Sequence, residues 1–371
     1  MVRRKFRYIH QLPGWPDLRW RQADLAAPLA AVRYRQGRLI SRMEALGFPL
    51  RQEASLRTLT LDVLKSSEIE GRILDPGQVR SSIARRLRMD IGGLVPSGRD
   101  VEGVVDMMLD ATRHFDRPLT AARLRGWQAA LFPLGSAGRP GMRVGAWRDD
   151  AKGPMQVVSG AVGHERVHYE APAAGRIDAE MADFLDWVNR RDGIDPVLRA
   201  AGAHFRFVTI HPFDDGNGRI ARAIADWALA RSEASPQRFY SMSSQIRLER
   251  KDYYAVLERT QKGPLDITGW MSWFLGCLDR ALSRTETALA AVFRKERFWK
   301  AHAGAALNTR QRMILNRVQD GFEGKLTSSK WAKLAKCSQD TAQRDILGLM
   351  EQGILAKDAA GGRSTSYSLR V

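Results

Sequence analysis

The sequence predicts a mainly α-helical protein with a small β-hairpin beside its central helices and a separate C-terminal domain. Three observations support this prediction. Apolar residues recur at helical spacing through most of the 371 residues. Residues 155–172 are rich in β-type residues around a glycine-containing turn, which is typical of a hairpin. Residues 308–371 change in character, with three short helical patterns before a Gly-Gly turn.

The helical patterns are separated by loops of different length. The first pattern runs from Leu25 to Met43. Residues 135–154 are rich in glycine and proline and predict a loop. A chain of this length allows two or three domains. The remaining patterns predict helices over 55–75, 98–114, 119–132, 176–192, 196–210, 219–232, 250–261 and 267–300.

The residues that point to chemistry lie in one stretch, His-Pro-Phe-Asp-Asp-Gly-Asn-Gly-Arg-Ile-Ala-Arg, which begins at His211 and ends at Arg222. Pro212 cannot continue the helix of 196–210, so we expect His211 at the C-terminal edge of that helix. The Gly-Asn-Gly turn at 216–218 tolerates left-handed backbone angles and suits a tight loop. This loop opens the next helix, whose free N–H groups form an anion site.

These residue types are suited to handling a nucleotide phosphate. The imidazole of His211 can take a proton from an attacking hydroxyl, and Asp215 offers the hard oxygen that Mg²⁺ uses with phosphates. Arg219 and Arg222 lie three residues apart on one helix face and can stabilise phosphate charge. The alternative is a helix–loop–helix corner with a buried histidine and solvated arginines. It explains each residue singly but not the whole string.

The string reads H-x-F-x-D-G-N-G-R-x-x-R, which resembles the signature of the Fic (filamentation induced by cyclic AMP) family. Most members of that family transfer AMP from ATP to a hydroxyl on a protein. The resemblance implies an all-α Fic core with a β-hairpin flap. Gly218 stands where the Doc-like kinase branch has a lysine, which favours nucleotidyl over phosphoryl transfer. The implied site has His211 as catalytic base, Asp215 as Mg²⁺ ligand, and Asp215, Gly216, Asn217, Gly218, Arg219 and Arg222 around the phosphates of ATP.

Two flanking segments receive roles from the same resemblance. A flap that holds the target segment by strand addition is expected at Val157, Val158, Ser159 and Gly160; the alternative is an ordinary surface hairpin. The wall of the adenine pocket is expected at Tyr253, Tyr254 and Gln261, because tyrosine can stack on a base and glutamine can hydrogen-bond it. We expect at least one of the two tyrosines to be a core residue instead.

A third segment, Ser66-x-x-x-Glu70-Gly71, resembles the inhibitory helix of family members in which that helix precedes the core. Ser66 and Glu70 are one helical turn apart and share a face, and Gly71 suits the end of a helix. The resemblance places Glu70 against Arg222, the arginine needed for the γ-phosphate of ATP. On its own, such a pattern is more often a plain helix end than a switch.

The C-terminal residues resemble a winged helix–turn–helix, with helices predicted over 310–318, 328–336 and 338–352 and a hairpin over 357–370. Ser338 would cap the recognition helix of this domain. From residue 308 onward there are eleven Lys or Arg and six Asp or Glu, so the domain is mildly basic and DNA is a candidate partner. The alternative is a module for protein interaction or dimerisation, which would make a homodimer.

The overall charge and the cysteines limit the class of protein. A net charge of +18 favours a polyanionic partner, with nucleotide or nucleic acid first. Cys277 and Cys337 lack metal-ligand spacing, which argues against a zinc site or a disulfide scaffold. The first residues lack the apolar run of a signal peptide, and no apolar run has the length of a membrane span. We therefore expect a cytoplasmic protein without a membrane partner.

These expectations combine into one organisation and one function. Residues 1–97 form an N-terminal helical region with the inhibitory helix, 98–300 the Fic core and 308–371 the winged helix. The expected activity is transfer of AMP from ATP to a Tyr, Thr or Ser hydroxyl of a target protein or of the chain itself, restrained by Glu70. The alternatives are a transcription regulator whose Fic core only senses ATP, and an enzyme that removes AMP. The sequence does not name the target.

Overall fold

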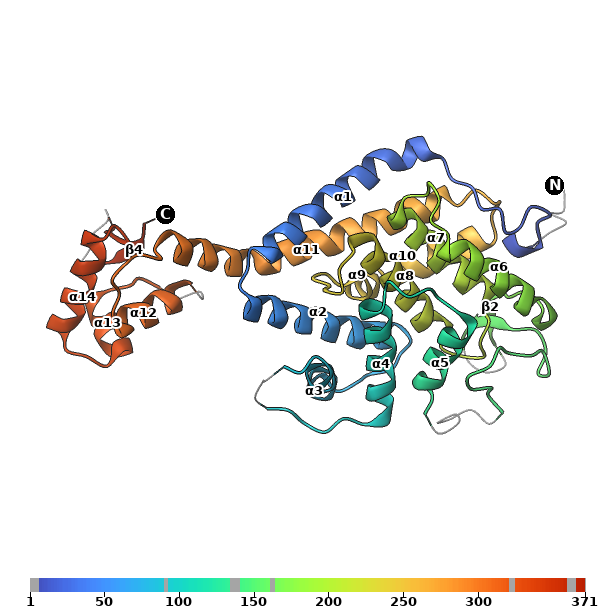
Figure 1. Ribbon diagram of the computed structural model, residues 1–371, viewed down its shortest axis with the longest axis horizontal. Coiled ribbons are helices and arrows are strands. Elements are labelled where there is room, and N and C mark those ends of the chain that lie inside the picture. The colour runs from blue at the N-terminus through green and yellow to red at the C-terminus, as the bar shows by residue number, and fades with distance from the viewer. Residues whose placement is uncertain are drawn as a thin grey trace. The chain divides into compact units, whose positions relative to one another are not determined.

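A computed structural model describes residues 7–89, 93–133, 141–160, 164–319, 324–358 and 365–370. The chain is mostly helical, with two small two-stranded sheets (Figure 1), which confirms the predicted mainly α class. It divides into two compact units, Met1–Thr285 and Glu286–Val371. The division falls inside the long helix α11 (Thr268–Ala301), which therefore contributes residues to both units.

Two consecutive helices form the centre of the first unit. In α7 (Pro196–Ile210) every residue from Val197 onward is buried, and α8 (Asn217–Glu233) is buried over most of its length. The Asp195 side chain caps α7 by accepting a hydrogen bond from the amide of Val197 at 2.8 Å. Because both helices are covered on all sides, the loop that joins them is held firmly at the centre of the unit.

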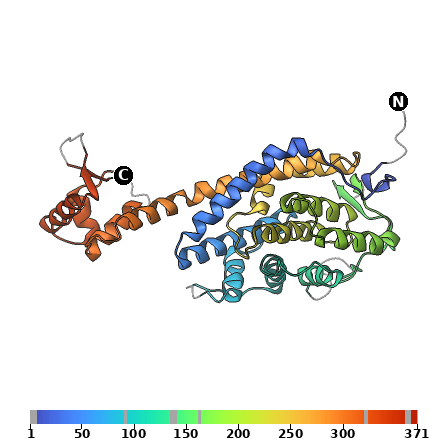
Figure 2. The same ribbon diagram turned by 45° about the horizontal axis from the view of Figure 1, so that its top comes forward.

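The helices around this pair pack tightly. A Cβ on Gly103 would overlap the carbonyl oxygen of Ala130, so the two helices that carry these residues meet backbone to backbone. Helix α1 runs beside the first part of α11 (Figures 1 and 2), where Arg35 pairs with Asp279 at 2.6 Å. The surrounding helices are α1 (Gln22–Glu44), α4 (Arg99–Arg113), α5 (Ala121–Leu131), α6 (Ile177–Asn189) and α10 (Arg250–Gln261).

The predicted hairpin is confirmed as an antiparallel pair, β1 (Gln156–Ser159) and β2 (Arg166–Glu170). The pairing has a bulge between Val157 and Val158. Tyr169 on β2 is buried, and its hydroxyl donates to the carbonyl oxygen of Thr209 at 2.7 Å. This bond ties the hairpin to the last turn of α7. Two short 3-10 turns, η1 (Ile9–Gln11) and η2 (Ala174–Arg176), complete this side.

The prediction of one helix over 55–75 is wrong at both ends. The structure has α2 (Phe48–Ile69) and a separate α3 (Pro76–Arg86). Gly71 adopts φ 77° and stops α2, and Asp75 then caps α3 by accepting from the amide of Gln78 at 2.7 Å. The helices α3 and α9 (Met242–Leu248) were not predicted, because each is short and their capping residues, Asp75 and Ser241, were not recognised as helix starts.

Over its described residues, the second unit has the end of α11, three further helices and a strand pair around its own apolar core. Trp331 and Ile346 are fully buried in this core. The strands pair antiparallel, with Leu355 opposite Leu369. The Gly-Gly tip of the predicted hairpin and Arg363 lie outside the described residues. The elements are α12 (Thr309–Gln319), α13 (Ser328–Ala335), α14 (Gln339–Glu351), β3 (Leu355–Lys357) and β4 (Tyr367–Leu369).

Within the described ranges, no helix combines the length and the apolar character that crossing a membrane requires.

Candidate active site

A cavity of about 640 Å³ opens between the hairpin, α10 and the loop that joins α7 to α8. Its walls come from segments that are far apart in the sequence. Each predicted group (for catalysis, for the flap, for the adenine pocket and for the inhibitory helix) contributes at least one residue to it, but Gly160, Asp215, Arg219, Arg222 and Ser66 do not line it. The predicted residues that line it are Glu70, Val157, Val158, Ser159, His211, Gly218, Tyr253, Tyr254 and Gln261.

His211 ends α7 in a left-handed conformation, with φ 53° and ψ 56°. Its amide still donates to the carbonyl oxygen of Phe207 at 3.0 Å, so the helix turns sharply at this residue. On the side chain, Nδ1 lies 3.2 Å from the carbonyl oxygen of Val208, which can only accept. The proton of a neutral imidazole therefore sits on Nδ1, and Nε2 carries the lone pair of a base.

The surroundings of His211 keep it neutral. Burial lowers the pKa of His211 to about 4, and the guanidinium of Arg148 acts in the same direction. Arg148 is itself buried; its Nε donates to the carbonyl oxygen of His211, and its amide donates to that of Pro212, both at 2.9 Å. Arg148 thus clamps the motif loop. Arg148 could not be predicted from the sequence, because it follows a segment without periodicity.

The loop after His211 is stabilised by its own side chains. Asn217 is buried, and its amide group accepts from the backbone of Phe213 at 3.0 Å and donates to it at 2.7 Å. Its side chain therefore shapes the loop, so any contact of this residue with a phosphate would come from its backbone N–H. Asp215 accepts from the amide of Gly216 at 2.6 Å, and Gly216 adopts φ 91° at the start of α8. A side chain would interfere with its neighbours at either predicted loop glycine. A Cβ on Gly216 would lie 3.1 Å from Leu131, and a Cβ on Gly218 would overlap Glu70.

Two buried arginines make the first turns of α8 strongly positive. Arg219 stacks on Phe132 with its guanidinium carbon 5.0 Å from the ring centre, and burial lowers its pKa to about 10. Arg222 is 2% exposed, and its Nη1 has no hydrogen-bond partner among the described residues. A Cβ on Gly218, at the cavity wall, would lie 3.3 Å from this Nη1. Helix amides and arginines together form a site for an anion.

The segment predicted to be inhibitory lies against this anion site. Arg222 Nη2 donates to Glu70 Oε1 at 2.8 Å and to the carbonyl oxygen of Ser66 at 2.9 Å, while its Nε donates to the Ser66 hydroxyl at 2.9 Å. A Cβ on Gly218 would overlap the Glu70 carboxylate. The absence of a side chain at Gly218 therefore lets Glu70 reach the first turn of α8. Gly71 ends α2 directly after this contact.

The residues predicted to surround adenine differ in exposure. Tyr253 is buried and its hydroxyl lies 2.9 Å from Nε2 of His204, so this tyrosine is part of the core as well as of the cavity wall. Tyr254 is 38% exposed, with Arg250 over its ring at 5.4 Å. Gln261 is buried and donates to the Thr209 hydroxyl at 3.3 Å. Tyr254 is thus the more accessible of the two rings for stacking on a base.

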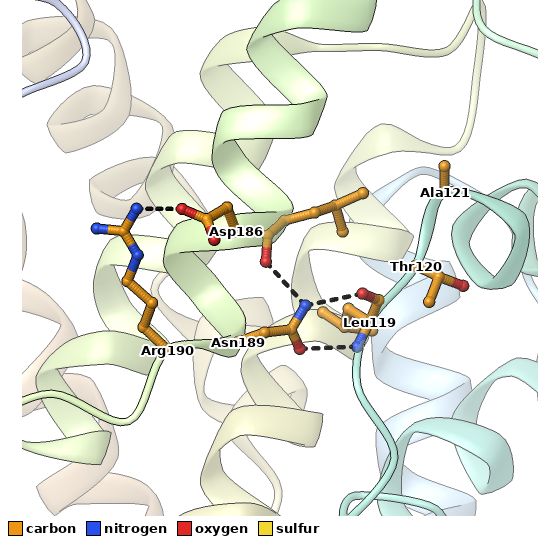
Figure 3. Close-up of a pocket in the computed structure, with 7 residues that line it drawn as sticks. Leu119, Thr120, Ala121, Asp186, Asn189 and Arg190 are labelled. Atoms are coloured by element: carbon orange, nitrogen blue, oxygen red, sulfur yellow. Dashed lines mark hydrogen bonds and ion pairs between the residues drawn. The ribbon is translucent and has the colours of Figure 1, made fainter.

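A second hollow lies away from the motif, between the start of α5 and the end of α6 (Figure 3). Its polar groups bond to one another. Asn189 donates to the carbonyl oxygen of Leu119 at 2.8 Å and accepts from its amide at 3.0 Å, and Arg190 pairs with Asp186. Such a surface offers a ligand no unsatisfied charge, in contrast to the cavity at α8.

Comparison with known proteins agrees with this geometry. Residues 118–229 match the model of the Fic/DOC family, and residues 8–89 match a domain of unknown function (DUF4172). The segment that matches the Fic/DOC model contains the motif at 211–222. Two solved structures share the fold. A Fic family protein from Desulfovibrio desulfuricans G20 has a TM-score of 0.52 and 21% identity, covering 93% of this chain and 95% of that chain. Fic-1 from Caenorhabditis elegans has a TM-score of 0.52 and 23% identity, covering 73% and 74%.

Similar sequences carry the name protein adenylyltransferase. Protein adenylyltransferase fic-1 of Caenorhabditis briggsae is 39% identical over 88 residues, which are 23% of this chain and 16% of that protein. Protein adenylyltransferase Fic of Nematostella vectensis is 33% identical over 115 residues, which are 30% of this chain and 25% of that protein. The matched segments thus span a quarter or less of the length of these relatives.

The lowered pKa of His211 gives the first prediction. The pKa of His211 is 6.5 in the unfolded chain and about 4 in the folded chain. Between these two pH values the unfolded chain binds a proton at His211 that the folded chain does not. The contribution of His211 to stability is therefore lost as pH falls through this window. In an NMR titration of the full chain, the His211 imidazole should stay neutral at pH 5.5, with a midpoint near pH 4. The signal is assigned by its loss in His211→Gln; a midpoint at 6.5 or above would contradict the prediction.

Proposed function

We propose that this chain is a protein adenylyltransferase that transfers AMP from ATP to a Tyr, Thr or Ser hydroxyl of a target protein or of itself. The observation that carries this proposal is the orientation of His211, whose Nε2 is left as a base beside the anion site of α8. The hydroxyl oxygen bonds to the α-phosphorus, diphosphate leaves, and the hydroxyl proton passes to Nε2. The names of the relatives support the same reaction.

The residues at the start of α8 fit a magnesium nucleotide. Asp215 keeps 33% of its side chain exposed and lies 3.9 Å from Arg219, so its carboxylate is at the edge of the anion site. One carboxylate together with substrate phosphates is a usual set of ligands for Mg²⁺. Bound there, the ion would offset charge on the leaving diphosphate. Arg219 and the amides of Asn217 and Gly218 would bind the phosphate oxygens.

The second prediction tests the reaction. With the Glu70→Gly variant, label from α-³²P-ATP should appear on protein and label from γ-³²P-ATP should not. In lysate, adding His211→Ala should lower the labelling of other proteins by ~10²–10⁴, because their proton acceptor is lost. The measurement is autoradiography of the full chain with and without lysate. Transfer of the γ label would identify a kinase instead, and reversible binding of ATP without any label would favour an ATP sensor.

We propose further that Glu70 restrains this activity. The carboxylate holds Arg222, and it lies against Gly218, where a phosphate would approach the first turn of α8. A negative group in an anion site repels the ligand, so ATP binds in a poor position or weakly while Glu70 stays docked. The supporting observation is that Ser66 and Glu70, one turn apart on α2, both bond to the same guanidinium.

The third prediction concerns this restraint. Glu70→Gly should raise self-modification on the order of ten- to a hundredfold, because a hydrogen bond to a charged group contributes ~1.5–3 kcal/mol. Arg222→Ala should lower activity in either background. The matched control is Glu68→Gln, since Glu68 lies on the same helix but pairs with Lys65 at 2.7 Å and with Arg247 at 3.3 Å. An unchanged rate in Glu70→Gly would place the restraint elsewhere or make Glu70 purely structural.

We propose that residues 308–371 form a winged helix that binds DNA. The observation in favour is the tight turn between α13 and α14, in which Lys336 adopts φ 47° and Ser338 caps α14 by accepting from the amide of Thr341 at 3.2 Å. This is the geometry of a helix–turn–helix. Arg344 is exposed on α14, and Lys357 is exposed on β3. The alternatives, a protein-interaction module or a dimer contact, would leave these charges without a phosphate partner.

The fourth prediction tests DNA binding by gel shift of the full chain on random duplex. Affinity should fall steeply as salt rises, because phosphate contacts release counterions. Arg344→Ala should weaken binding by ~1–3 kcal/mol if it reads a guanine, and Lys357→Ala should weaken all sequences alike. Arg190→Ala, an exposed arginine of the first unit, is the control of equal charge. The absence of a shift at low salt would exclude DNA and favour a protein partner.

A further inference from the structure

Three side chains at the hairpin form a continuous hydrogen-bonded chain that the roles above do not use. The hydroxyl of Ser159 on β1 lies 2.5 Å from Nε2 of His168 on β2. Nδ1 of His168 lies 2.7 Å from Oε2 of Glu258 on α10. The chain therefore joins a hydroxyl, an imidazole and a carboxylate from three different elements.

The direction of these hydrogen bonds follows from Glu258. Lys262 Nζ donates to its carboxylate at 2.6 Å, and Arg166 Nη2 donates at 3.4 Å. Burial works in the opposite direction, but the bonds from Lys262 and His168 lower the pKa of Glu258 to about 2. A carboxylate only accepts, so His168 holds its proton on Nδ1. Its Nε2 then accepts from the Ser159 hydroxyl, which is the arrangement that activates a serine nucleophile.

This serine lines the same cavity as the proposed phosphate site. Ser159, His168 and Glu258 line the same cavity as His211 and Gly218. A group attacked by Ser159 would gain negative charge, which positive groups must stabilise. The first turn of α8 and its buried arginines are such groups. They are suited to a phosphate. Ser159 is also exposed, so its hydroxyl is accessible from the cavity.

We propose that Ser159 is a self-modification site, which accepts AMP from ATP with His168 as its proton acceptor. The Ser159 oxygen bonds to the α-phosphorus, the bond from that phosphorus to the β-phosphate oxygen breaks, and diphosphate leaves. The serine proton passes to Nε2 of His168, whose positive charge is stabilised by Glu258. This inference rests on the proposed adenylyl transfer, since ATP supplies the group.

The test maps the modified residue by peptide mass spectrometry after incubation of the full-length Glu70→Gly chain with Mg-ATP. The adenylyl group should be found on Ser159, should be absent from this peptide in Ser159→Ala and should return on the new hydroxyl in Ser159→Thr. His168→Gln should slow the appearance of this adduct on the order of 10²-fold, because general-base help is lost. His164→Gln is the matched control, since His164 is an exposed histidine beside the same hairpin and should leave the rate unchanged.

Release of diphosphate from ATP is measured in parallel. It distinguishes failure of the proposed adenylyl transfer from failure of Ser159 as the acceptor. If neither diphosphate nor any adduct forms, the proposed adenylyl transfer itself fails. If diphosphate forms and AMP is found only on other peptides, Ser159 is not the acceptor and this inference is overturned. An adduct on Ser159 whose rate is the same in His168→Gln also overturns it, because the proton then leaves by another route.

Discussion

A buried guanidinium determines how the catalytic unit is assembled. Arg222 lies inside α8 with almost no contact with solvent, and a charge in that position requires negative or polar partners. Ser66 and Glu70 supply them from α2, which must therefore run across the start of α8. Gly218 leaves the space for this approach. The ion pair of Glu70 with Arg222 thus holds α2 against α8, although the two helices are far apart in the sequence. The pair lies where a phosphate would bind.

The geometry of His211, the proposed base, also depends on buried contacts. The half-buried His211 has a neutral imidazole because desolvation lowers its pKa, and Arg148 and Asn217 hold its loop against the helix pair. The Nδ1 contact to Val208 depends on the left-handed turn at the end of α7. Orientation, protonation and position of this side chain therefore share one cause, the packing of the loop between two buried helices. A change in that packing would alter all three together.

The sequence predicted the parts of the site that depend on local chain geometry. The end of α7 before Pro212 and the turn into α8 follow from proline and glycine, and the helix at 196–210 was predicted with its exact bounds. Long-range partners were predicted only where the family resemblance supplied them, as for Glu70 and Arg222. Arg148 and Glu258 were missed, because nothing in their own neighbourhood marks a residue whose partners lie more than fifty positions away.

Helix α2, which carries the proposed restraint on Arg222, is also held by a second contact, and this limits how the restraint could be released. One turn before Ser66 on α2, Asp62 is buried; it accepts from the Ser241 hydroxyl at 2.5 Å. Burial, reinforced by the nearby carboxylate of Asp226, raises the pKa of Asp62 to about 8, while Arg238 acts against this and pairs with Asp226 at 3.0 Å. Withdrawing α2 would break the buried hydrogen bond from Ser241 to Asp62, at a cost of about 1–3 kcal/mol for a buried polar group left without its partner. Rotation of the Glu70 side chain, which is 31% exposed at the end of the helix, requires no such step. The structure therefore favours release by movement of one carboxylate while the helix stays docked.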